Sequence, residues 1–152
     1  MRRYLGFAFI VLVLGACAKS IIEDSNESDF VIKAGTVCGW CAQNDTLTID
    51  GSKIRYVNFI QCNTTNPSVK KTGEIDQESL NQLKASLDFA EFKKLDMNSC
   101  NVCVDGCDDW ITIKNGVESH TIRFSRNDPK LQPLKSFVEN LSSLKEKYKT
   151  AN

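Results

Sequence analysis

The residues of this 152-residue chain that could do chemistry are its seven cysteines. They are Cys17, Cys38, Cys41, Cys62, Cys100, Cys103 and Cys107. The last three fall within eight residues, and the first follows an N-terminal apolar run. Thiols at such spacings can pair as disulfides, hold a metal ion or exchange with other disulfides. If Cys17 is modified separately, the other six form an even set that can pair internally.

The N-terminus predicts an export signal. A short basic segment, residues 1–4, precedes an apolar run over residues 5–16 that is too short to span a bilayer. The tetrapeptide Leu14-Gly15-Ala16-Cys17 at its end resembles the lipobox of bacterial lipoproteins. This resemblance implies cleavage before Cys17, a diacylglyceryl group on its thiol and acylation of its amine. The alternative is an ordinary secreted protein with a leftover cysteine near an Ala-x-Ala-like cleavage site.

The same resemblance predicts where the protein is held and how it is divided. Several acyl chains anchor a protein firmly to a membrane, and Ala18 in place of Asp favours the outer membrane by analogy with lipoprotein sorting. We expect a signal peptide over residues 1–16, a lipidated flexible tether over 17–29 and one folded domain over 30–149. In general pattern the chain is similar to the uncharacterised small envelope lipoproteins of Bacteroidota-type bacteria, and that likeness implies no particular activity.

Charge gives no indication of nucleic-acid binding. The chain carries 19 Lys and Arg against 19 Asp and Glu, and it has no basic stripe with interleaved aromatic residues. Lys145, Lys147 and Lys149 are expected on the solvated face of a last helix, near the end that its dipole makes favourable for cations. We therefore expect a membrane contact through lipid, and no nucleic-acid partner.

Hydrophobic patterning predicts an α+β domain. Two turn dipeptides, Asp50-Gly51 and Asn115-Gly116, mark hairpins between β-rich runs. The β-rich runs cover residues 30–37, 46–49, 53–62, 69–75, 110–114 and 117–124. Asp76 and Asp128 are expected to cap two helices, each with apolar residues at helical spacing. The expected fold is an antiparallel sheet of five or six strands with two helices on one face, braced by disulfides.

In an oxidising compartment the six remaining cysteines are expected to pair, although they allow 15 connectivities. Pairing across the Asp50-Gly51 turn would gather Cys38, Cys41 and Cys62 at one end of that hairpin, with Cys41 opposite Cys62 in one register. Cys107 precedes the second hairpin at the end far from its turn. The upstream and downstream thiols can meet if the two hairpins are neighbours in the sheet.

Two alternatives use the same thiols. Cys38-Gly39-Trp40-Cys41 is similar to the redox pair of thioredoxin-like proteins, but strand residues follow it where that chemistry needs a helix. The pairs Cys38/Cys41 and Cys100/Cys103 also have the spacing of a thiolate zinc site, which would leave two thiols over. The oxidising compartment favours disulfides, so we expect no metal and no cofactor.

The remaining candidates have structural interpretations. Asp105, Asp108 and Asp109 lack the spacing of a calcium loop and are expected to form a solvated acidic turn. The only histidine, His120, lies on an apolar strand face, where a hydrogen bond is expected to hold it.

Trp40 and Trp110 lie near cysteines, where they would pack on disulfides or form a partner-binding patch. The sequence as a whole predicts a non-enzymatic envelope lipoprotein that acts as a binding, inhibitory or structural module. We expect it to have no catalytic residues.

Overall fold

The computed structural model describes residues 29–59 and 69–150. The expected signal peptide, the expected lipidation site Cys17 and the disulfide candidate Cys62 lie outside these residues. Cys41 lies in a described turn, but its side chain is outside the description.

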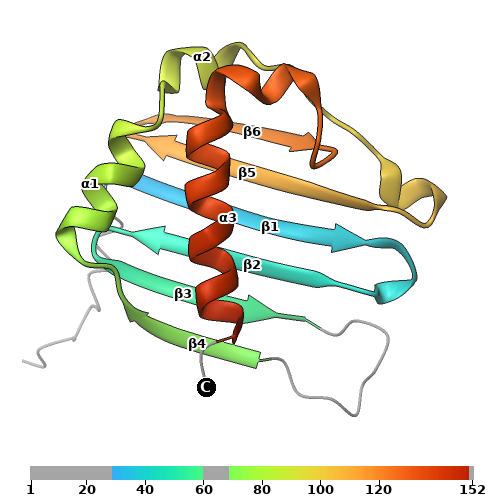
Figure 1. Cartoon of the computed structure of the whole chain (residues 1–152), viewed down its shortest axis with the longest axis horizontal. Coiled ribbons are helices and arrows are strands. Elements are labelled where there is room, and N and C mark those ends of the chain that lie inside the picture. Colours follow the sequence, from blue (N-terminus) through green and yellow to red (C-terminus); the bar gives the residue numbers. More distant parts are fainter. Residues whose placement is uncertain (1–28, 60–68, 151–152) are drawn as a thin grey trace, which may run out of the picture.

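The described chain is built on a six-stranded antiparallel sheet in the order β4-β3-β2-β1-β5-β6 (Figure 1). The strands are β1 (Phe30–Cys38), β2 (Asn44–Asp50), β3 (Lys53–Asn58), β4 (Val69–Glu74), β5 (Cys107–Asn115) and β6 (Glu118–Phe124). Both predicted hairpins form, with Gly51 at φ 57° and Gly116 at φ 61° in the left-handed region that their turns require. The predicted α+β class and antiparallel sheet are confirmed.

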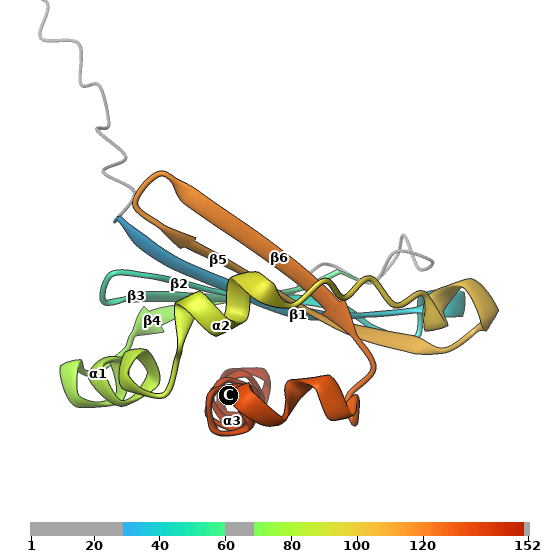
Figure 2. The same ribbon diagram turned by 90° about the horizontal axis from the view of Figure 1, so that it is seen from above.

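All the longer helices lie on one face of this sheet (Figure 2). They are α1 (Gln77–Ala85), α2 (Phe89–Lys94) and α3 (Lys135–Thr150). The described residues also contain three 3₁₀ helices: η1 (Gly39–Cys41) between β1 and β2, η2 (Asn101–Val104) between α2 and β5, and η3 (Pro129–Leu134) directly before α3. Figure 1 shows α3 running across the strands, so that one helix contacts both halves of the sheet.

The predicted helices differ from the observed ones in two places. The apolar pattern that begins at Leu80 is divided between α1 and α2, because the Asp88 side chain accepts a hydrogen bond from the Glu91 N–H and starts a second helix. The last helix opens with η3, which contains Pro133, a residue that lacks the N–H of a regular α-helical bond. Asp76 and Asp128 cap helices as predicted.

The hydrophobic core lies between the sheet and the helices. Strand register places Ile32 opposite both Ile49 and Ile113, and all three side chains are buried. Phe137 and Leu141 of α3 belong to the same buried cluster. Because side chains alternate along a strand, this register also fixes which polar residues point toward α3.

The free edge of β6 is covered by the loop before η2. The Arg123 N–H donates to the Met97 carbonyl at 2.9 Å, and the Ser99 N–H donates to the Arg123 carbonyl at 2.9 Å. His120 of β6 faces the same region, where its Nε2 lies 2.9 Å from the Leu95 carbonyl oxygen. The predicted structural hydrogen bond of His120 is confirmed.

Candidate functional site

A disulfide closes one end of the sheet. Cys38, the last residue of β1, lies opposite Cys107, the first residue of β5, and the two form a disulfide with Cα atoms 4.0 Å apart. The upstream and downstream thiols do meet, but the expected condition for it is wrong: the two hairpins are not neighbours, because β1 lies between them and pairs with β5. A second disulfide joins Cys100 to Cys103 around η2.

Cys38 was expected near Cys41 and Cys62 at one end of the Asp50-Gly51 hairpin, and its observed partner is different. The register of β2 with β3 is the predicted one, with Asp50 opposite Lys53. Cys38, however, ends β1 rather than extending β2, because the chain reverses direction through η1. Its partner is therefore Cys107 across β1 and β5, and a Cys38–Cys41 bond is not formed.

The loop that carries η2 is organised around Asp108, which is fully buried (0% exposed). Its Oδ1 accepts hydrogen bonds from Ser99 Oγ at 2.7 Å, the Asn101 N–H at 3.0 Å and Asn101 Nδ2 at 2.9 Å. Its Oδ2 accepts from the Val102 N–H at 3.1 Å and lies 3.3 Å from Arg123 Nε. The expectation that Asp108 lies in a solvated acidic turn is therefore wrong, because the amides of the loop bind its carboxylate in place of water.

These contacts keep Asp108 ionised. Burial acts to raise the pKa of Asp108, but the hydrogen bonds and the Arg123 guanidinium outweigh it, so the pKa lies below its ordinary value. A carboxylate with a depressed folded pKa stabilises the fold fully above its unfolded pKa of about 3.9. That contribution is lost as the pH falls through the folded pKa.

Replacing Asp108 by asparagine should lower the free energy of unfolding at pH 7 by about 3 kcal/mol, since an amide NH₂ then faces backbone donors in a buried site. The deficit should shrink as the pH falls below the unfolded pKa of about 3.9, because the stabilisation by the Asp108 carboxylate is then progressively lost. Urea unfolding at pH 7 and pH 3 measures both effects. The exposed Asp105→Asn is the matched control and should stay within about 0.5 kcal/mol of wild type. An equal deficit at both pH values would contradict the linkage.

The two short helices at this end form a joint surface, which we call the tip and define as residues 39–41 and 100–106. The Gly39 N–H donates to the Gly106 carbonyl at 2.9 Å. A Cβ atom on Gly39 would lie 2.9 Å from the Cα of Asp105, so only glycine permits this approach. The tip is thus held by backbone contact and by the disulfides beside it.

Trp40 projects from this tip. The residue is 82% exposed, and its backbone adopts φ 51°, ψ 23° in the left-handed region. Val104, on the neighbouring turn, is 78% exposed. Packing of Trp40 on a disulfide, the interpretation that the sequence favoured, therefore does not describe its ring.

Trp110 occupies a different environment. It is half-buried in β5 opposite Gly35 of β1, and a Cβ atom on Gly35 would lie 2.8 Å from the indole ring. The ring thus packs against the bare backbone of the neighbouring strand. The two tryptophans are distributed between the tip and the sheet.

A second polar centre lies under α3, where Lys145 reaches the sheet. Its Nζ donates to Thr36 Oγ1 at 2.6 Å and lies 3.2 Å from Asp45 Oδ1. Lys145 is buried, so the expected solvated face is wrong for this lysine. Asp45 is fully buried and also accepts from the Thr36 N–H at 2.9 Å and from Gln43 Nε2 at 2.6 Å.

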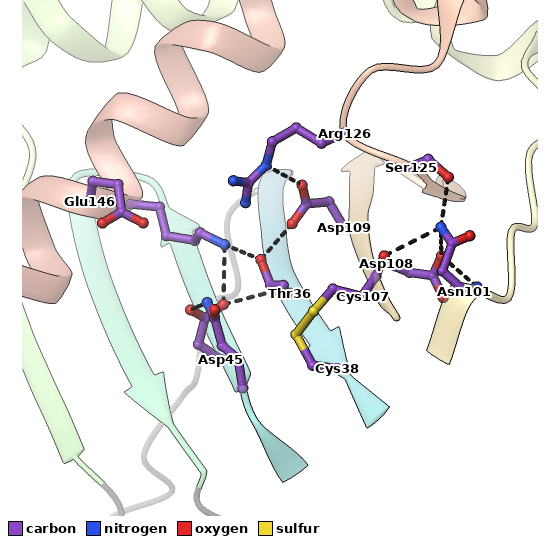
Figure 3. A network of polar contacts seen from close by, with 12 residues as sticks. Thr36, Cys38, Asp45, Asn101, Cys107, Asp108, Asp109, Ser125, Arg126 and Glu146 are labelled. Carbon is purple, nitrogen blue, oxygen red and sulfur yellow. Dashed lines mark hydrogen bonds and ion pairs between the residues drawn. A yellow bond between two sulfur atoms is a disulfide. The ribbon is translucent and has the colours of Figure 1, made fainter. Parts of the chain in front are cut away.

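Figure 3 shows the contacts of this centre, and the donor and acceptor groups fix the direction of its hydrogen bonds. An ammonium has no lone pair, so Lys145 must donate to the Thr36 hydroxyl. The single Thr36 hydroxyl proton is then donated to Asp109 Oδ1. The other Asp109 oxygen accepts from Arg126 Nε at 3.2 Å. The result is a polar chain from α3 through β1 to the loop after β6.

Tyr56 completes the centre on the β3 side. Its hydroxyl lies 3.3 Å from Asp45 Oδ2. Burial, followed by the charge of Asp45, raises the pKa of Tyr56 well above its ordinary value. The phenol therefore stays protonated and donates to the carboxylate throughout the physiological pH range.

The sequence carried a signal for this centre. Asp45, Leu47 and Ile49 share the buried phase of β2. Lys145 likewise follows Phe137 and Leu141 at intervals of four on the apolar side of α3. A carboxylate and an ammonium at core positions of two elements could have indicated a buried pair, although Lys145 was expected on a solvated face.

Within residues 29–59 and 69–150, no group of three or more His, Cys, Asp and Glu residues is placed to hold a metal ion. No helix in this part of the chain combines the length and apolar character needed to cross a membrane. No protein-family model matches the chain. No curated protein matches it either.

Proposed function

We propose that this protein is a non-enzymatic envelope lipoprotein, anchored through Cys17, that presents its tip to a protein partner. The observation that carries the proposal is Trp40, which is 82% exposed on the tip. Exposed tryptophans are enriched among the residues that dominate binding energy, because they bury a large area at a small cost in conformational entropy. The partner would offer an apolar cleft to Trp40 and Val104.

The position of the tip supports this proposal. The tether would enter the domain at Phe30, where the Gly116 N–H donates to the Asp29 carbonyl at 2.6 Å. The nine residues of β1 separate this point from Cys38 by about 30 Å at about 3.4 Å per residue. The tip therefore lies at the end of the sheet opposite to the point at which the tether would enter the domain.

The backbone of Trp40 gives a second line of support. A left-handed conformation costs a residue with a Cβ atom about 1 kcal/mol relative to glycine. An exposed aromatic side chain at such a position returns little packing energy to the fold. Strain of this kind is concentrated where a side chain serves binding or catalysis.

The two buried carboxylates support the non-enzymatic part of the proposal. Asp45 and Asp108 are both fully buried and accept several hydrogen bonds from the protein. A substrate would have to displace these partners to reach either group. Their contacts are those of structural carboxylates.

Two substitutions at position 40 separate binding from stability. Trp40→Ala should abolish partner capture and leave stability unchanged, because it removes the ring and keeps the Cβ atom. Trp40→Gly should also abolish capture, yet raise the free energy of unfolding by about 1 kcal/mol. The measurements are urea unfolding of the mature chain and photocrosslinking from a probe at position 40 in intact envelopes.

The matched control is Val117, a fully exposed apolar residue at the β5–β6 turn, at the other end of the sheet. A probe at position 117 should not give the adduct that position 40 gives, and Val117→Ala should leave capture unchanged. The proposal fails if both probes give the same adducts, or if Trp40→Ala is captured as well as wild type.

A further inference from the structure

A pocket of about 470 Å³ opens between α3 and the β1–β5–β6 part of the sheet. Its apolar wall includes Ile111, Phe124, Val138 and Leu141, and Arg126 and Lys145 also line it. This volume lies within the range of small-molecule sites in proteins. The pocket thus joins an apolar wall to the polar chain that ends at Arg126.

Two cationic side chains on the polar side of the pocket have N–H groups that their contacts within the protein do not use. Arg126 has five N–H groups, and the contact to Asp109 uses one of them. Lys145 has three, and its contacts to Thr36 and Asp45 use two. The Arg126 side chain is 75% exposed, so its remaining donors can reach a ligand without refolding of the protein.

The acidic residues around the pocket are already matched. Asp109 receives Thr36 and Arg126 on its two oxygens. Glu139 and Glu146 of α3 also line the pocket, and each lies beside a lysine: Glu139 is 3.9 Å from Lys135, and Glu146 is 3.4 Å from Lys149. A ligand carboxylate would therefore meet unused N–H groups rather than uncompensated negative charge.

We propose that this pocket binds a small monocarboxylate with an apolar body. The carboxylate pairs with the outer nitrogens of Arg126, since a guanidinium matches the two oxygens of a carboxylate in plane. Lys145 adds positive charge from beneath. The apolar body lies along Phe124, Val138 and Leu141. This proposal is independent of the tip, because no residue of the tip lines the pocket.

The test uses the mature chain from residue 17 onward with Cys17→Ser, which carries no lipid. Titration calorimetry compares three probes of equal chain length: octanoate, octan-1-ol and octylammonium, each below its aggregation concentration. Octanoate should bind at one site per chain, and the alcohol and the amine should bind at least 10-fold more weakly.

Arg126→Gln should weaken octanoate binding at least 10-fold, since the neutral amide cannot form the charged pair. Arg55→Gln is the matched control: Arg55 is exposed on β3 and points to the opposite face of the sheet from its buried neighbours Ile54 and Tyr56. It should bind octanoate as wild type does, and thermal unfolding should be alike for both variants. Equal binding of octanoate and octanol, an unchanged affinity in Arg126→Gln, or no saturable heat would overturn the proposal.

Discussion

Replacing Cys38 and Cys107 together by serine should lower the free energy of unfolding by about 4 kcal/mol. The bond joins residues 69 positions apart, and closing so long a loop removes much of the entropy of the unfolded chain. The double variant avoids a free thiol that could exchange with the remaining disulfides. Urea unfolding of the two proteins in the absence of reductant measures the difference.

The second disulfide supplies the internal comparison for this prediction. Cys100 and Cys103 are three positions apart, so the same chain-entropy argument gives a loss of about 2 kcal/mol for their joint replacement. The long-range pair should therefore cost more than the local one. Equal losses in the two double variants would show that loop length does not set their contributions.

Lys145→Met should destabilise the protein by about 3–5 kcal/mol, because it leaves the buried Asp45 without its countercharge. Lys147 lies two residues further along α3, on its exposed side. Lys147→Met should therefore change stability by less than about 0.5 kcal/mol. Urea unfolding at pH 7 of both variants provides the measurement. A small loss in Lys145→Met would mean that water reaches Asp45 and replaces the ammonium.

A second substitution tests whether charge is the cause. Lys145→Met combined with Asp45→Asn removes the isolated negative charge while it keeps an oxygen acceptor for the Thr36 N–H. The double variant should be more stable than Lys145→Met alone, so the two effects are not additive. A double variant less stable than either single variant would instead assign the loss to packing of the lysine stem.

The strands and turns were accessible from sequence because each is a local signal. Asp50-Gly51 and Asn115-Gly116 fix turn geometry and register, and alternation then assigns the buried face. The Cys38–Cys107 bond, by contrast, depends on β1 lying between the two hairpins. The sequence predicted the meeting for two neighbouring hairpins, and it gave no local signal that β1 would insert between them.

The polar centres were predicted less well, for a physical reason. Lys145 and Asp108 were assigned to solvent because charged residues are seldom buried without a partner. The reasons differ between the two residues. Asp45 is 100 positions from Lys145 in the sequence. Asp108 is bound by nearby backbone amides, which carry no signal in the side-chain sequence. Trp40 shows the reverse case, since a residue usually buried is held out in water by the turn around it.

The pairing of residues 97–99 with β6 has a consequence for many copies held side by side. A bare strand edge can recruit the edge of another molecule and start a growing ribbon. A lipid anchor confines molecules to two dimensions, where encounters between neighbours are frequent. The hydrogen bonds of Arg123 to Met97 and Ser99 occupy one outward-facing position of that border, and at the opposite border β4 carries Lys70 and Lys71, whose like charges repel a second copy. If copies are crowded by the proposed lipid anchor, both features act against edge-to-edge pairing of their sheets.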